Sequence, residues 1–219
     1  MKLTVIGSTG RTGRHVVSDA TRRGHEVTAF TRRPDALAGV ERLAAVVHGD
    51  GRDPAVVARA VDGADAVIAI VAAPSRRGPH EAAAVARCVT AAMAGAGVSR
   101  LVVTSAYPVV GTRPRLPMTL LRVMLARPYA DVRKMEAVES ASGLAWTVVR
   151  LNRLTDGAAR DDVEVSRDLL DRPAGLTRAD AGAFLLDAAE SDAWARTAVN
   201  LAGRSPAGRR RPHLKEQHS

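Results

Sequence analysis

A run of glycines near the start of the chain has a clear chemical use. Gly7, Gly10 and Gly13 follow the apolar segment Leu3–Ile6 and open a stretch with helical spacing. The first can end a strand in a tight turn, the second lets the backbone approach a ligand, and the third lets a helix pack closely on the strand. Free amides and the positive helix end would then face a diphosphate, unless the segment is an ordinary glycine-rich turn. The predicted diphosphate site comprises Gly7, Ser8, Thr9, Gly10, Arg11, Thr12 and Gly13.

Two arginines after the next apolar segment refine the predicted ligand. Arg32 and Arg33 stand about 20 residues after the glycines, where an NAD site usually has Asp or Glu for the ribose 2′-hydroxyl. Two guanidinium groups can instead hold a 2′-phosphate through charge-assisted, bidentate contacts. The pair favours NADPH over NADH, and the alternative is that both side chains only solvate a loop. After the third strand-like segment come Asp50, which is placed to accept from an adenine amino group, and Gly51.

The elements that must position these residues alternate between two periods. Apolar segments of strand length are Leu3–Ile6, Val27–Phe30, Ala44–Val47, Ala66–Val71, Leu101–Thr104, Trp146–Val149 and Ala198–Leu201. Helical segments are Arg11–Arg22, Pro54–Val61 with Asp53 as N-cap, His80–Ala94, Val132–Ser142 and Ala179–Glu190. Continuous apolar strands alternating with helices predict a parallel sheet covered on both faces, which is a doubly wound α/β fold of the Rossmann type. We expect one domain over residues 1–203 and a basic, disordered tail over 204–219.

The charge and composition of the chain restrict the kinds of binding partner that we expect. The chain carries a net charge of +9, and residues 204–219 contain five basic residues and one acidic residue. Two Phe, two Tyr and two Trp provide few surfaces for base stacking, so we expect no nucleic acid partner. No apolar run approaches the roughly 20 residues of a membrane span, and the histidines are scattered. We therefore expect a cytoplasmic monomer or homodimer without a membrane or metal partner.

Further segments carry a resemblance to a known family. Over about residues 1–203 the chain resembles the atypical short-chain dehydrogenase/reductases, and within that group it is similar to NmrA-like proteins and flavin reductases of the biliverdin-IXβ reductase type. Besides the glycines and Arg32, the resemblance is carried by Gly49-Asp50, Val102–Ala106, Lys134–Arg150, Leu154–Gly157 and Leu176–Asp180. It implies an NAD(P)H-binding protein whose site lies at the carboxyl ends of the strands.

The resemblance also implies residues around the nicotinamide. Ser105 and Lys134 are its candidate catalytic residues. Ser105 can hydrogen-bond the acceptor or the nicotinamide amide, or only satisfy local backbone, and Lys134 can reach phosphate or substrate, or only lie on a helix surface. The remaining expected cofactor contacts are Ala72, Ala73, Thr104, Leu151 and Asn152.

The sequence departs from the wider family at the acid that protonates a ketone. The usual Tyr-x-x-x-Lys pair is absent, because Tyr129 is followed at that spacing by Arg133 and Tyr107 by Gly111. The absence of this pair favours an acceptor that takes hydride without a protein acid, such as a flavin, quinone or similar conjugated ring. Residues 113–128 are expected to shape the acceptor pocket or to form a core or dimer helix. The alternatives are a non-catalytic NADP(H)-binding redox sensor or regulator, and a tailoring reductase in a biosynthetic pathway.

Overall fold

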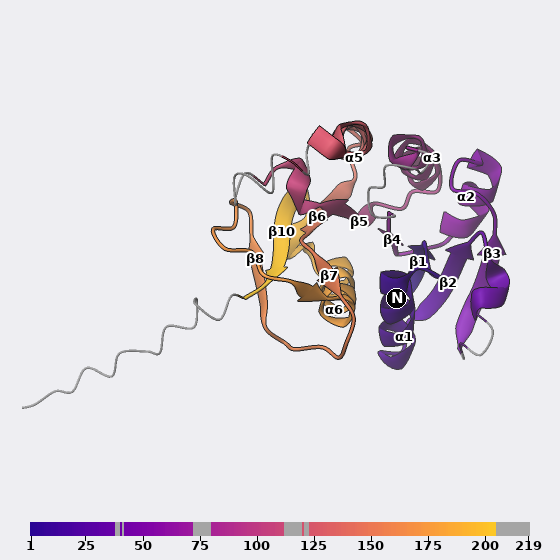
Figure 1. Ribbon diagram of the computed structural model, residues 1–219. Helices are drawn as coiled ribbons and strands as arrows, with labels where there is room; N and C mark the ends of the chain where they lie inside the picture. Colours follow the sequence, from indigo (N-terminus) through magenta and orange to yellow (C-terminus); the bar gives the residue numbers. More distant parts are fainter. Residues whose placement is uncertain (38–39, 41, 72–79, 112–119, 121–122, 205–219) are drawn as a thin grey trace, which may run out of the picture.

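A mixed sheet of eight strands runs through the centre of the molecule (Figure 1). The computed structural model describes residues 1–37, 40, 42–71, 80–111, 120 and 123–204. In spatial order the strands are β3 (Leu43–His48), β2 (Glu26–Thr31), β1 (Lys2–Ile6), β4 (Ala66–Ala69), β5 (Arg100–Ala106), β6 (Ala145–Leu151), β10 (Thr197–Gly203) and β8 (Val163–Ser166). All neighbours are parallel except β10 and β8, and the chain reverses its direction of travel across the sheet between β1 and β4.

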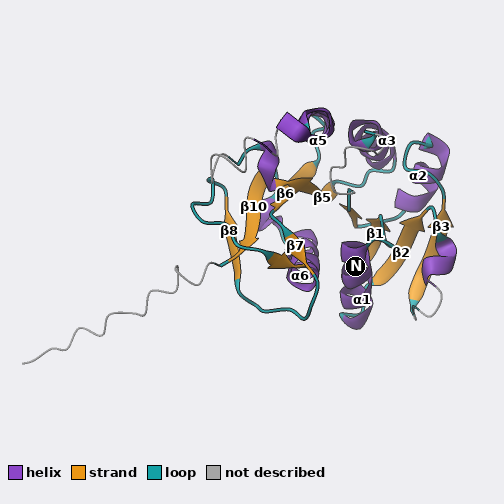
Figure 2. Cartoon of the chain, viewed as in Figure 1, coloured by secondary structure: helices purple, strands orange, loops and turns teal. Residues whose placement is uncertain are grey.

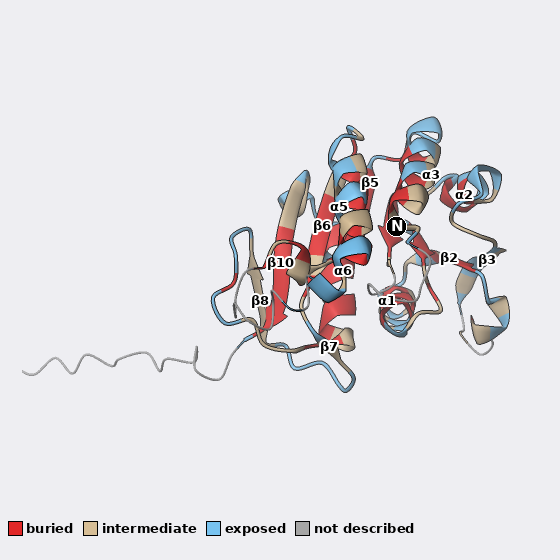
Figure 3. Cartoon of the chain, turned by 45° about the horizontal axis from the view of Figure 1, so that its top comes forward, coloured by how far each residue is buried: buried red, intermediate tan, exposed pale blue. Residues whose placement is uncertain are grey.

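Helices cover both faces of this sheet (Figure 2). Helices α1 (Arg11–Arg22) and α6 (Arg178–Glu190) pack on one face, and α2 (Pro54–Val61), α3 (Ala82–Gly95) and α5 (Ala126–Ser140) pack on the other. Successive residues of β5 enter the two cores alternately, Val102 on the α1 side and Val103 on the α3 side. Burial is accordingly greatest along the central strands and the inward sides of the helices (Figure 3). The doubly wound Rossmann fold of one domain is confirmed.

Capping chemistry explains where the helices begin. Asp53 accepts the amides of Ala55 and Val56, as the N-cap prediction requires, and α1 and α2 have the predicted bounds. Helix α5 begins at Ala126 rather than at the predicted Val132. Its first turn contains Pro128. Amides in the first turn of a helix have no acceptor within the helix, so a proline is tolerated there and does not delay the start of α5.

Three short strands were not predicted. The pair β7 (Leu154–Thr155) and β9 (Leu176–Thr177) is too short for any periodicity, and β8 lies antiparallel at the edge, so the sheet is not parallel throughout. No helix in the described ranges is long and apolar enough to cross a bilayer.

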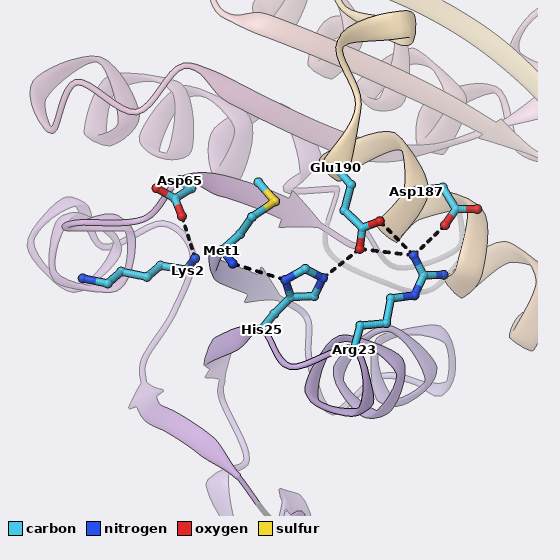
Figure 4. Close-up of polar contacts among 7 residues, drawn as sticks. All are labelled: Met1, Lys2, Arg23, His25, Asp65, Asp187 and Glu190. Atoms are coloured by element: carbon cyan, nitrogen blue, oxygen red, sulfur yellow. Dashed lines mark hydrogen bonds and ion pairs between the residues drawn. The ribbon is translucent and has the colours of Figure 1, made fainter.

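Polar contacts tie the ends of α1 and α6 together at the amino edge of the sheet (Figure 4). Arg23, which caps α1, donates through Nη1 to Asp187 Oδ1 at 2.7 Å and to Glu190 Oε2 at 3.0 Å. His25 lies between the terminal amino group of Met1, at 3.4 Å, and Glu190 Oε1, at 2.7 Å. Two helices far apart in the sequence are therefore joined away from the carboxyl edge of the sheet.

Tyr107 has a structural position in this fold. Its ring is fully buried in the 3-10 turn Tyr107–Val109 after β5. The hydroxyl donates to Leu170 O and accepts from Leu170 N, both at 3.1 Å. Burial raises the pKa of this phenol, chiefly by desolvation. The hydroxyl therefore holds the segment after β8 against the end of β5.

Replacing Tyr107 with Phe should lower the free energy of unfolding by about 1–3 kcal/mol, because both backbone groups of Leu170 would lose their buried partner. Tyr129→Phe is the matched control, since Tyr129 is also buried and its hydroxyl bonds to no described residue. Urea titrations of both variants measure the difference. Equal stability losses would contradict the assigned role of the Tyr107 hydroxyl.

Candidate functional site

The glycine turn connects β1 to α1, and a side chain has no room at Gly7 or Gly13. Gly7 has a positive φ of 80°, a conformation that favours glycine, and its amide donates to Phe30 O at 3.2 Å. A Cβ at Gly13 would collide with the carbonyl oxygen of Gly7, and a Cβ at Gly7 with that of Ile70. Ser8 is buried and its hydroxyl also donates to Phe30 O, at 3.0 Å. The turn is thereby fixed against β2 and β4.

The first turn of α1 has unused hydrogen-bond donors. Its N-cap is Gly10, which has no side chain to accept them, and no acidic residue lies in the first turn. The amides of Arg11, Thr12 and Gly13 precede the first residue that can bond within the helix, Arg14, whose amide donates to Gly10 O at 3.0 Å. Amides in this arrangement, at the positive end of a helix, bind anionic groups.

Arg32 and Arg33 are exposed just beyond the end of β2. The amide of Arg33 donates to Thr31 Oγ1 at 3.0 Å, and that hydroxyl is 2.8 Å from Thr9 Oγ1 in the glycine turn. The loop that carries both arginines is therefore attached directly to the predicted diphosphate site.

Asp50, at the end of β3, is engaged by its neighbour Arg52. The carboxylate accepts from the Arg52 amide at 2.9 Å, from Nε at 3.0 Å and from Nη2 at 2.7 Å. These bonds lower the pKa of Asp50 to about 2, with a smaller contribution from the charge of Arg32. Arg32 thus lies close enough to Asp50 to act on it electrostatically. Recognition of adenine by Asp50 stays a prediction, and it would have to use the remaining lone pairs of the carboxylate.

A second helix start lies beside the first. Asp156, which follows β7, pairs with Arg11 at the start of α1 and with Arg178 Nη1, at 2.7 Å, at the start of α6. Sequence reasoning assigned Arg11 to the cofactor but gave no role to Asp156 or Arg178. The short β7–β9 ladder, which carries no periodic signal, is what brings these residues together.

Polar side chains meet at the ends of β5 and β6. Thr104 Oγ1 accepts the amide of Val71 at 2.9 Å, and so holds the segment that follows β4. On the opposite face Ser105 Oγ donates to Glu136 Oε1 at 2.5 Å. Arg150 donates to the same carboxylate from Nε, at 3.0 Å, and from Nη2, at 2.7 Å. The side chains of Arg150 and Glu136 are only 18% and 13% exposed, so this is a largely desolvated cluster.

Glu136 is the residue that sequence reasoning missed. It lies within the segment Lys134–Arg150 that carries the resemblance, and the signal that points to it is the helical spacing that puts it on the inward side of α5 near buried Met135. Lys134 itself is exposed on α5 and forms no hydrogen bond or ion pair with a described residue. The structure therefore joins Ser105 to Glu136 and Arg150, and leaves Lys134 apart from them.

The remaining predicted contacts have structural partners or lie outside the described residues. Leu151 is buried, and Asn152 bonds to Leu201 O through its amide and to Ala174 O through Nδ2, at 3.0 and 2.8 Å. Gly51 faces Val85, whose side chain a Cβ would crowd. Ala72, Ala73, most of 113–128 and the tail from 205 lie outside the described residues.

A cavity of about 710 Å³ opens beyond the ends of β6 and β10. Arg153, Thr155, Asp180 and Gly203 are among its lining residues. Its volume is in the range of pockets that hold small organic ligands.

The fold, the glycine turn and the free helix start define a dinucleotide-binding Rossmann protein. The chain belongs to the family of NAD(P)H-binding proteins, because the model of that family matches residues 7–192. This match confirms the resemblance to the atypical short-chain dehydrogenase/reductases, and with it NAD(P)H as the class of cofactor.

Solved structures share the fold at low sequence identity. A short-chain dehydrogenase/reductase from Veillonella parvula in complex with NADP is 18% identical, with a TM-score of 0.78 and 94% of each chain covered. An anaerobillin reductase from Escherichia coli is 21% identical, with a TM-score of 0.78 and coverage of 94% of this chain and 98% of that one. A candidate NADH-flavin reductase from Streptococcus pneumoniae is 19% identical, with a TM-score of 0.76 over 93% and 100%.

Glu139 is a buried acid one turn beyond Glu136. It is 2% exposed, lies among apolar side chains of α3 and β5, and its Oε2 has no hydrogen-bond partner among the described residues. Burial raises the pKa of this carboxyl well above its ordinary value, and the charge of Glu136 adds to the effect. Burial therefore favours the neutral form of the side chain.

Glu139→Gln should make stability less dependent on pH. The folded pKa lies above the unfolded value of about 4.3, so the unfolded chain ionises first and stability falls as the pH rises from about 4 toward the folded pKa. Glutamine removes that contribution. Urea titrations across this range measure the slope, with exposed Glu26→Gln as the control. Indistinguishable slopes in the wild type and Glu139→Gln would refute the neutral form.

Proposed function

We propose that the protein is an NADPH-dependent reductase that transfers hydride to a flavin, quinone or similar conjugated ring. The observation that carries the cofactor assignment is the first turn of α1, where the amides of Arg11, Thr12 and Gly13 have no acceptor within the helix. A diphosphate placed there directs the adenosine toward the ends of β2 and β3 and the nicotinamide toward β5 and β6, since the sheet order reverses between β1 and β4.

Two arginines support the choice of NADPH over NADH. Arg32 and Arg33 are exposed beyond β2 and form no ion pair with a described residue, so both guanidinium groups remain available. Arg32 also acts on Asp50 at the adjacent strand end, which is where the adenosine ribose would lie. A 2′-phosphate would receive charge-assisted hydrogen bonds there.

The described residues around the end of β5 favour an acceptor that needs no protein acid. The hydroxyl of Tyr107 is occupied by Leu170, and the hydroxyl proton of Ser105 is directed at Glu136. NADPH supplies the hydride, and a conjugated ring spreads the added charge and takes its proton from water. The chain then contributes orientation and exclusion of water.

The same observation favours a second candidate. A non-catalytic NADP(H)-binding redox sensor or regulator also has no use for a tyrosine acid. Oxidation of NADPH by the purified protein with a panel of flavins and quinones separates the two. Turnover with any of these acceptors supports the reductase. Tight binding of NADP⁺ and NADPH without turnover would favour the sensor.

Arg32→Ala should weaken NADPH binding by about 10- to 100-fold and leave NADH binding nearly unchanged, because only NADPH carries the phosphate that the guanidinium contacts. Isothermal calorimetry with both cofactors measures the ratio. Arg22→Ala, an exposed arginine at the far end of α1, is the control for lost positive charge. An equal loss for NADPH and NADH would refute the phosphate contact.

A further inference from the structure

Ser105 and Arg150 lie side by side at the carboxyl edge of the sheet. They are partners in the register of β5 and β6, so their side chains leave the sheet on the same face, toward α5. Glu136 of α5 contacts both, at 2.5 Å from Ser105 Oγ and 2.7 Å from Arg150 Nη2. One carboxylate therefore fixes the orientation of both neighbours.

Glu136 determines what Ser105 can offer to a ligand. A serine hydroxyl has one proton and two lone pairs, whereas an ionised carboxylate only accepts. The proton of Ser105 must therefore point to Glu136, and the lone pairs remain for a ligand. Ser105 is 9% exposed, and no described residue donates to its Oγ. Toward any ligand that reaches it, Ser105 is therefore a hydrogen-bond acceptor.

Arg150 supplies the complementary group. Its Nε and Nη2 donate to Glu136, while Nη1 donates to no described residue and the side chain as a whole is 18% exposed. The guanidinium therefore keeps donors beside the acceptor on Ser105. An acceptor next to a donor matches the edge of a planar amide, in which an N–H stands beside a C=O.

We propose that Ser105 and Arg150 bind the amide edge of a ligand, with Glu136 as the residue that positions them. Ser105 accepts from the N–H and Arg150 donates to the carbonyl. The inference rests on the proposed function in one respect, namely that a nicotinamide and a conjugated acceptor meet at this edge. Strand β5 is two strand spacings, about 10 Å, from the glycine turn that would hold the diphosphate.

Two ligands that the proposed function would bring to the ends of β5 and β6 carry such an amide edge. One is the nicotinamide, through its carboxamide, and the other is a flavin-type acceptor, through its cyclic imide. A quinone has carbonyls but no N–H, and it would leave the lone pairs of Ser105 unused. The site therefore distinguishes classes of conjugated ring that the loss of a tyrosine acid does not distinguish.

The test uses equilibrium binding of two matched pairs of probes. NADP⁺ is compared with its 3-acetylpyridine analogue, in which a methyl ketone replaces the carboxamide. Lumiflavin is compared with its 3-methyl derivative, which lacks the imide N–H, in the presence of NADP⁺. The wild type should bind the amide-bearing member of at least one pair about tenfold more tightly. The pair that shows the preference identifies whether cofactor or acceptor occupies the site.

Ser105→Ala should abolish that preference, and Ser140→Ala, an exposed serine of α5, should leave it intact. Glu136→Gln should also reduce it, because a glutamine amide can donate to Ser105 and turn its proton toward the ligand. A merely structural defect would weaken both members of a pair alike, so the ratio within the pair reports the polarity of the hydrogen bond. Restoration of the ratio by Glu136→Asp supports a role for the carboxylate.

Equal affinities within both pairs for the wild type would overturn the proposal, as would a preference that survives Ser105→Ala. Neither result depends on turnover. A protein that shows the preference but never oxidises NADPH leaves this site standing and removes the reductase. A protein that reduces flavins but shows no preference within either pair of probes supports the reductase and refutes this site.

Discussion

The site depends on the close approach of two backbone segments, the turn at Gly7 and the start of α1 at Gly13. No Cβ fits between them, because at Gly13 it would collide with the carbonyl oxygen of Gly7. This contact places the helix start directly over the end of β1 and leaves its first amides facing outward. The other parts of the site, from Arg32 at the end of β2 to Ser105 at the end of β5, are arranged along the sheet relative to that point.

Charged side chains lie beside the free amides at the start of α1. Asp156 joins Arg11 of α1 to Arg178 of α6, so two positive helix ends and two guanidinium groups surround one carboxylate. At the ends of β5 and β6 the arrangement is reversed, because there one carboxylate, Glu136, organises a hydroxyl and a guanidinium. A single carboxylate therefore organises each of these two parts of the carboxyl edge, Asp156 between two helix starts and Glu136 between two strands and α5.

Sequence reasoning located the features that short motifs encode. The glycine turn, the N-cap Asp53 and the alternation of strands and helices are local, so their residue types and spacing predicted the bounds of α1 and α2 and the places of the main strands along the chain. Contacts made by tertiary structure were not accessible. Glu136 meets Ser105 only because α5 packs beside β5, and Asp156 meets Arg178 only through a two-residue ladder without periodicity. Lys134 was selected by family resemblance, but the turn of the helix directs it outward.

The two helices on the α1 side are joined at both of their ends. At the amino edge Arg23 connects α1 to Asp187 and Glu190 of α6, and at the carboxyl edge Asp156 connects their starts. The two helices also share one apolar core, in which Val16 and Val17 of α1 and Leu185 of α6 are buried, so a shift of one helix along the sheet would require that core to repack. Asp156, in the loop that follows β6 and β7, is attached to the starts of both helices, so the position of that loop relative to the start of α1 is determined by the packing of the two helices.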